Sequence, residues 1–144
     1  MNIRPIYILL LAAFLFGGCS NTVTDHYPTR AEAEADNLFE RGWLPSFIPA
    51  SANDITTSNN LDISTSEGEF RYNPKQANEF LAYLKPYSGQ NPKFEGWQTY
   101  IAKQIKNGNE AFEYCADKTV WVFFVNAVTG HVRYIMWYDH SSKT

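Results

Sequence analysis

Two neighbouring segments decide the fold, Thr119–Asn126 (TVWVFFVN) and His131–Tyr138 (HVRYIMWY). Both are rich in the β-branched and aromatic residues that favour strands. The residues between them, 127–130 (AVTG), end in a glycine that can take the positive φ of a four-residue hairpin loop. We therefore predict an antiparallel hairpin in which Asn126 pairs with His131.

This register places apolar side chains on both faces of the hairpin. One face would hold the pairs Phe124/Arg133, Val122/Ile135 and Val120/Trp137. The other face would hold Val125/Val132, Phe123/Tyr134, Trp121/Met136 and Thr119/Tyr138. Two arrangements satisfy this pattern: helices cover both faces of a centrally placed hairpin, or one aromatic face is exposed for a partner.

Helix signals occur three times upstream of the hairpin. A capping-box sequence at 29–32 (TRAE) starts a helix expected over 30–41, which Gly42 would end. Asn73 followed by a proline starts a second helix, which should run to about Leu84. Apolar spacing over 97–105 predicts the third helix.

The remaining patterns indicate strands and one irregular stretch. Strands are expected around Ile55 and over 68–72 and 111–115. Two prolines in 43–49 (WLPSFIP) exclude a helix interior or a central strand, so this stretch should cross the core or follow an edge. The prediction is an α+β fold: an antiparallel sheet of about four or five strands with a C-terminal hairpin, packed by about three helices.

The N-terminus is typical of a bacterial lipoprotein signal. An apolar run, 6–16 (IYILLLAAFLF), precedes two glycines and Cys19. Eleven helical residues rise only about 16 Å, too little to span a bilayer core of roughly 30 Å. We expect a signal peptide over residues 1–18, cleavage after Gly18, and lipidation of Cys19 with acyl chains such as palmitate. The alternatives are an ordinary secretory signal cleaved near Gly18 and an uncleaved anchor.

The predicted lipoprotein signal has consequences for the domain layout. Residues 19–28 are polar and lack periodicity, so they are expected to form a lipidated tether of about 30 Å at most. Residues 29–144 then form one globular domain. Ser20 stands where an aspartate would signal retention in the inner membrane, which favours the outer membrane, facing the periplasm.

Composition excludes some partners and cofactors. Loss of Arg4 with the signal leaves 11 basic and 15 acidic residues, a net charge of about −4, so nucleic acid is not an expected partner. Twenty-three aromatic residues supply a core (Trp 4, Tyr 9, Phe 10). If Cys19 is lipidated, Cys115 has no internal disulfide partner, and it is expected to be a buried small hydrophobe.

No pattern predicts catalysis, and no cofactor is expected. His26, His131 and His140 lack metal-binding spacing, and Asp139-His140-Ser141 are adjacent rather than convergent. The carboxylates, among them Glu67 and Glu69, are expected to be solvated because their spacing selects no pair.

One stretch resembles a known family. Gly42-Trp43-Leu44-Pro45, followed by Pro49, Ala52, Asp54-Ile55, Leu61-Asp62 and Glu69-Phe70, looks like a signature of small uncharacterised bacterial lipoproteins with a YbbD-type head domain. The resemblance covers roughly residues 38–72. It departs where an asparagine is common two places after Leu61-Asp62, since Ser64 stands here. The resemblance implies no activity.

The best account from the sequence is a membrane-anchored lipoprotein whose domain is a non-enzymatic binding module for an envelope protein or peptidoglycan. The candidate interaction surface comprises Trp43, Asp62, Trp121 and Tyr134. Two alternatives remain open. One is an envelope hydrolase with a carboxylate pair, and the other binds a small ligand in an aromatic pocket.

Overall fold

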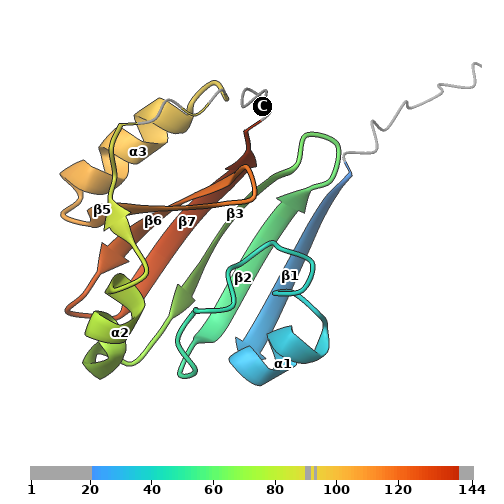
Figure 1. The fold of residues 1–144 in the computed structure, drawn as a ribbon, viewed down its shortest axis with the longest axis vertical. Coiled ribbons are helices and arrows are strands. Elements are labelled where there is room, and N and C mark those ends of the chain that lie inside the picture. Colours follow the sequence, from blue (N-terminus) through green and yellow to red (C-terminus); the bar gives the residue numbers. More distant parts are fainter. Residues whose placement is uncertain (1–20, 90–91, 93, 140–144) are drawn as a thin grey trace, which may run out of the picture.

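A single antiparallel sheet of seven strands organises the molecule (Figure 1). The computed structural model describes residues 21–89, 92 and 94–139. The strands lie in the order β1-β2-β3-β7-β6-β5-β4. Their bounds are β1 Thr22–Thr29, β2 Asn53–Asn60, β3 Thr65–Arg71, β4 Lys85–Pro86, β5 Glu110–Ala116, β6 Thr119–Asn126 and β7 His131–Tyr138. The predicted α+β class is confirmed, but the sheet has seven strands rather than four or five.

The C-terminal hairpin forms in the predicted register. Asn126 pairs with His131, and the pairing continues without a shift to Thr119 and Tyr138. Because β3 lies on one side of this hairpin and β5 on the other, β6 and β7 are central strands. Both faces of the hairpin are covered, so the first of the two predicted arrangements is correct.

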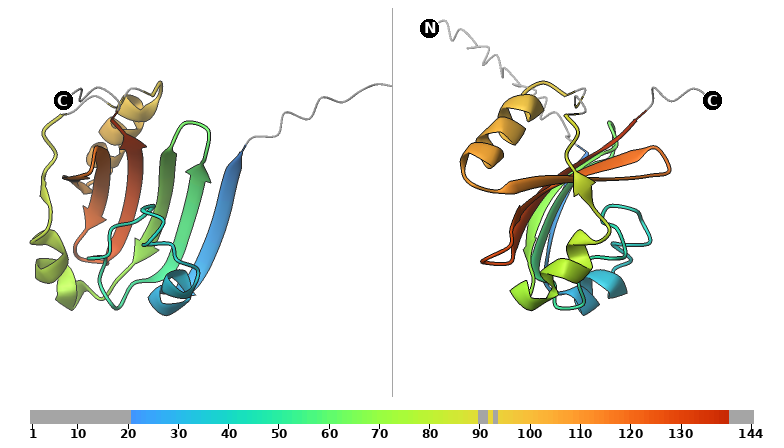
Figure 2. Two further views of the ribbon diagram at one scale, coloured as in Figure 1. Left: turned by 45° about the vertical axis from the view of Figure 1, so that its right-hand side comes forward. Right: turned by 60° about the vertical axis from the view of Figure 1, so that its left-hand side comes forward.

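Different elements cover the two faces of the sheet, as the right-hand view of Figure 2 shows. On the inner face, a core forms from Phe123, Tyr134 and their neighbours with α1 (Arg30–Ala35), the irregular segment 36–52 and α2 (Ala77–Leu81). On the outer face, α3 (Trp97–Lys106) packs over Val122, Ile135 and their neighbours. The helix therefore covers only the half of the outer face that contains the hairpin.

The predicted helix starts are correct, and two of the predicted ends are not. The side chain of Thr29 accepts from the backbone N–H of Glu32, but α1 ends at Ala35 because Asn37 takes a left-handed conformation (φ 58°). Asn73 caps a short 3₁₀ helix, Pro74–Gln76, that leads into α2. The second helix ends at Leu81, ahead of the predicted Leu84.

The proline-containing segment crosses the inner face of the sheet, which is the first of the two predicted paths. Leu44 and Ile48 are buried in the inner core, and the carbonyl of Trp43 accepts a hydrogen bond from the indole N–H of Trp121 at 3.1 Å. This bond satisfies a buried polar group that would otherwise reduce stability. The irregular segment thus replaces a covering helix.

Two other predictions are wrong. Residues 19–28 were expected to be a tether; residues 19 and 20 lie outside the described part of the chain, and 22–28 belong to β1, an edge strand paired with β2 from Thr22 to Thr29. Cys115 was expected to be buried, but it is exposed on β5. The pKa of its thiol is raised, chiefly by partial burial of the sulfur and then by Glu113, so the thiol is not activated.

Candidate functional site

The outer face of strands β1, β2 and β3 is the part of the sheet that α3 leaves open. The strand register places alternate residues on this face, and they are polar along all three strands. They are Thr22, Thr24 and His26 of β1, Thr56, Ser58 and Asn60 of β2, and Glu67, Glu69 and Arg71 of β3. We call this surface the polar face.

A groove runs between the polar face and α3. It consists of two cavities of about 350 and 320 Å³, both of which are lined by Ser58 and Glu67. One cavity lies at the end of the sheet where Thr22 and Ile63 are found, and the other extends to Thr56 and Arg133. Because the two cavities share part of their lining, they form one elongated depression.

Aromatic rings form the wall of the groove on the helix side. Phe94 and Trp97 line one cavity and Tyr100 lines the other, and all three are partly exposed. The rings are held from behind: Trp97 packs on Trp137 at 5.9 Å between centroids, and Tyr100 meets Phe124 edge-on at 5.6 Å. Rings fixed in this way can contact a ligand without losing much conformational entropy.

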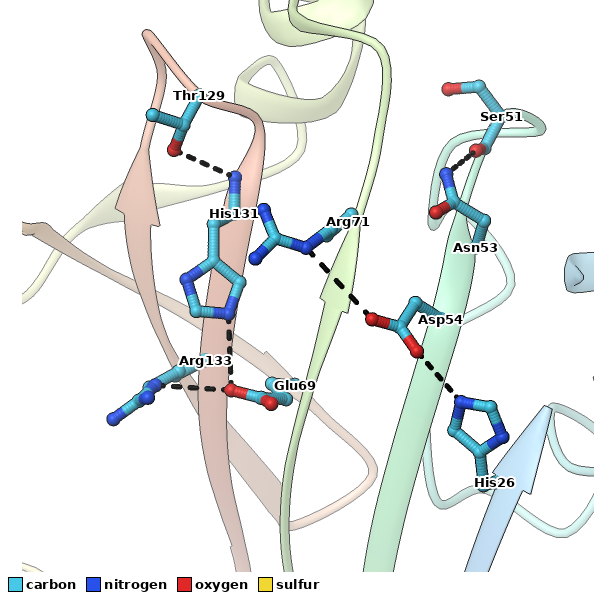
Figure 3. A network of polar contacts seen from close by, with 9 residues as sticks. All are labelled: His26, Ser51, Asn53, Asp54, Glu69, Arg71, Thr129, His131 and Arg133. Carbon is cyan, nitrogen blue, oxygen red and sulfur yellow. Dashed lines mark hydrogen bonds and ion pairs between the residues drawn. The ribbon is translucent and has the colours of Figure 1, made fainter. Parts of the chain in front are cut away.

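Charged groups are concentrated at one end of the groove, around Glu69 (Figure 3). The Oε2 atom of Glu69 accepts from Nε of Arg133 at 3.2 Å and lies 3.1 Å from Nε2 of His131. Burial raises the pKa of the Tyr100 hydroxyl; Glu67 and Glu69 raise it further, while Arg133 lowers it. Tyr100 therefore remains a neutral donor in the physiological range, next to carboxylate acceptors.

A second polar cluster lies farther along the same face. Figure 3 shows Asp54 between His26, at 2.8 Å, and Arg71, at 4.0 Å. Asp54 has a positive φ of 51°, and the β2–β3 register shifts between Asn53 and Thr56. This bulge turns the Asp54 side chain toward His26 and Arg71. All three side chains are more than half exposed, so their ion pairs contribute little to stability.

The structure separates the four residues of the predicted interaction surface. Trp121 and Tyr134 are buried in the inner core, so their assignment to an interaction surface is wrong. Trp43 is half-buried in the segment over the inner face. Asp62 is exposed in the β2–β3 turn, where its carboxylate accepts from the Asn21 side chain at 2.7 Å. The lipidation site, Cys19, lies outside the described residues.

The described residues form neither a metal site nor a membrane-spanning helix. In that part of the chain, no group of three or more His, Cys, Asp or Glu side chains is placed to hold a metal ion. None of its helices is long and apolar enough to cross a membrane. His26 of the polar face and His131 of β7 are paired with different carboxylates, Asp54 and Glu69.

One comparison with known proteins bears on this half of the sheet. Residues 21–71 match the family model of the YbbD head domain. The resemblance predicted from residues 38–72 is confirmed. The matched segment contains β1, α1, β2 and β3. The polar face, which forms the floor of the groove, therefore lies within the matched residues, whereas the aromatic wall on the side of α3 lies outside them. No curated protein and no solved structure matches the chain.

Sequence reasoning did not find the groove, although one signal was present. Residues 56–60 (TTSNN) are all polar, but because both faces of β2 are polar here, the sequence does not reveal which side is open. Asn59 and Thr57 point inward and are buried. The open side becomes recognisable only when Glu67 and Glu69 are paired with Ser58 and Thr56 across the sheet.

Proposed function

We propose that the protein is a lipid-anchored envelope protein whose domain binds a neutral glycan, without catalysis, in the groove between α3 and the polar face. The observation that carries this function is the pairing of an aromatic wall with a hydroxyl- and amide-rich floor. Sugar rings present C–H faces that pack on aromatic rings, and their hydroxyl groups pair with Ser, Thr, Asn and carboxylate side chains.

The charge of the groove lining distinguishes between anionic, cationic and neutral polar ligands. The groove contains Glu67, Glu69 and Glu95 against Arg133, a net acidic lining that repels phosphates and nucleic acid. Glu69 is already paired with Arg133 and His131, which leaves less free negative charge to attract a cationic peptide. A neutral glycan fits this balance best. The match to the YbbD head domain favours an envelope-associated protein, where peptidoglycan supplies such glycan strands.

The binding test is calorimetric titration of the protein with an N-acetylglucosamine tetrasaccharide. Trp97→Ala should weaken binding about tenfold, equivalent to about 1.4 kcal/mol, whereas Trp97→Phe keeps a ring and most of the affinity. Tyr83→Ala, which removes an exposed aromatic outside the groove, is the matched control and should leave binding unchanged. Absence of binding to the tetrasaccharide, or equal binding by Trp97→Ala, would contradict the proposal. Salt-sensitive binding of tetralysine in its place would identify a cationic-peptide site.

Hydrolysis is the second candidate because Glu67 and Glu69 both line the groove. They lie two residues apart on one strand, with Cα atoms about 6.6 Å apart. A glycosidase places its two carboxyl groups on either side of the scissile bond and keeps one protonated in an apolar pocket. Here both project from the same floor, and Glu67 is exposed, which favours binding over hydrolysis. Release of reducing ends from the tetrasaccharide, abolished by Glu67→Gln or Glu69→Gln, would reverse this preference.

The anchor is a separate part of the proposal. The apolar run before Gly17-Gly18-Cys19 supports cleavage after Gly18 and acylation of Cys19, with Ser20 favouring the outer membrane. The wild-type protein should incorporate labelled palmitate and pellet with membranes. Cys19→Ser should lose the label and become extractable by salt or carbonate. A Cys19→Ser variant that still pellets, together with an unlabelled wild type, would rule out the lipid anchor.

A further inference from the structure

The chain enters the described fold beside the turn between β2 and β3. The carbonyl of Asn21 accepts from the backbone N–H of Leu61 at 3.0 Å, and its side-chain amide donates to Asp62 at 2.7 Å. Figure 1 shows the start of β1 and this turn at the same end of the sheet. The first described residue is thus fixed to residues 61–62 by one backbone and one side-chain hydrogen bond.

This turn exposes two aliphatic side chains. Leu61 is 54% exposed and Ile63 is 47% exposed. A single exposed aliphatic residue is ordinary, and Val128 at the opposite end of the sheet, in the β6–β7 turn, is 88% exposed. What distinguishes Leu61 and Ile63 is their position next to the point where the chain arrives from Cys19.

The distance along the chain from Cys19 to Asn21 limits how far the turn can lie from the lipid anchor. Cys19 precedes Asn21 by two residues, which span about 7 Å at most. The tether of about 30 Å expected from sequence does not exist, because β1 starts at Thr22. If Cys19 carries acyl chains in a bilayer, Asn21 and the turn bonded to it lie at the level of the lipid headgroups.

We propose that the β2–β3 turn is a membrane-contact surface, with Leu61 and Ile63 entering the interfacial layer of the bilayer that holds the acylated Cys19. This inference rests on the lipid anchor of the proposed function. The same end of the sheet carries Asp62 in the turn and Asp117 and Lys118 in the β5–β6 turn, and these three side chains sum to one net negative charge. The contact is therefore apolar and does not require anionic lipid.

The contact would also orient the binding groove. Ile63 and Thr22 line one end of it, so the groove would begin near the bilayer and extend away from it toward Arg133. The β6–β7 turn would be distal to the membrane.

The experiment compares the two ends of the sheet in the full-length protein. In a Cys115→Ser background, Leu61→Cys and Val128→Cys are each labelled with an environment-sensitive fluorophore and reconstituted into vesicles of phosphatidylcholine and phosphatidylethanolamine. A lipid carrying a spin label near the headgroup should quench the label at 61 about twofold more than the label at 128. Adding Ile63→Asp to the Leu61→Cys variant should reduce this quenching, because a carboxylate resists transfer out of water.

Mass spectrometry of the same samples separates the two proposals. An acylated Cys19 with equal quenching at 61 and 128 would overturn the membrane contact and leave the anchor intact. A Cys19 without acyl chains would overturn the anchor, and the membrane contact with it. Quenching at 61 in a protein of acylated mass supports both.

Discussion

The β6–β7 hairpin and the β1–β3 strands belong to one sheet, but they differ in what covers their outer face. In the hairpin, Val122 and Ile135 are buried under α3 on the outer side, while Phe123 and Tyr134 are buried on the inner side. In β1–β3 only the inner side is covered. There Tyr27, Ile55, Phe70 and their neighbours are buried in the inner core. The outer side is the polar face.

The difference separates stability from the proposed binding role within one sheet. The inner core runs continuously under both regions, so burial on the inner side holds the strands of the polar face in register. Side chains on the polar face can therefore serve a ligand at little cost to folding. Substitutions on the two faces should separate these roles, starting from the residue that joins the two regions.

Phe80 should show the largest effect. It is fully buried and its ring contacts Phe70 of β3 at 5.9 Å and Phe123 of β6 at 5.7 Å, so it spans both regions. Phe80→Ala should lower the free energy of unfolding by about 3–5 kcal/mol, from lost burial and the cavity left behind. Urea denaturation measures this loss. A loss below about 1 kcal/mol would mean that the two regions do not share one core.

The pH dependence of stability tests how well the inner face excludes water at the edge strand. Burial, assisted by a hydrogen bond to Asp36 and by the charges of Asp25 and Asp36, raises the pKa of Tyr27 from 10.0 to about 12. Below pH 10 this phenol is protonated in both states. Between pH 10 and 12 it ionises in the unfolded chain first, so stability falls by up to about 1.4 kcal/mol per pH unit.

Tyr27→Phe should remove that contribution to the slope. The variant should be less stable than wild type at pH 8, because it loses the hydrogen bond to Asp36, by about 1 kcal/mol. Its stability should then decline less steeply between pH 10 and 12. Urea denaturation at several pH values gives both quantities, and an unchanged slope would show that Tyr27 is not shielded by the inner core.

The register of the hairpin could be predicted because its information is local: a strong strand composition and a glycine at the loop end specify it. The apolar residues on both faces left two arrangements open, and only the neighbouring strands β3 and β5 decide that the hairpin is central. The helix starts could be predicted equally well, since the side chains of Thr29 and Asn73 accept hydrogen bonds from backbone N–H groups within three residues of their own positions. The YbbD head match then covers the half of the sheet in which strand signals are weakest.

The rest depends on contacts distant in sequence. β1 has no apolar alternation and becomes a strand because β2 offers it a partner about thirty residues away. The helix 30–41 was predicted too long because Asn37 takes the αL conformation and the next residue, Leu38, is buried in the core, neither of which the helical spacing reveals. Gly68 looks like an ordinary strand glycine, yet a Cβ there would stand 2.0 Å from the carbonyl oxygen of Thr56.

The smallest effect is expected at Ser58, and its neighbour Asn59 makes the comparison sharpest. Ser58 faces outward and accepts from Thr24 at an exposed position, so Ser58→Ala should change stability by less than about 0.5 kcal/mol. Asn59 faces inward, where it accepts from Ser66 at 2.6 Å, so Asn59→Ala removes one of the two hydrogen-bond partners of that buried hydroxyl, the other being Tyr134, and should cost about 1–3 kcal/mol. Calorimetry with the tetrasaccharide should reverse the order: Ser58→Ala weakens binding, while folded Asn59→Ala retains it. Opposite effects of the two substitutions on stability and on binding would show that the inner face of β2 stabilises the fold and the outer face binds the ligand. Parallel effects would mean that the polar face also stabilises the fold.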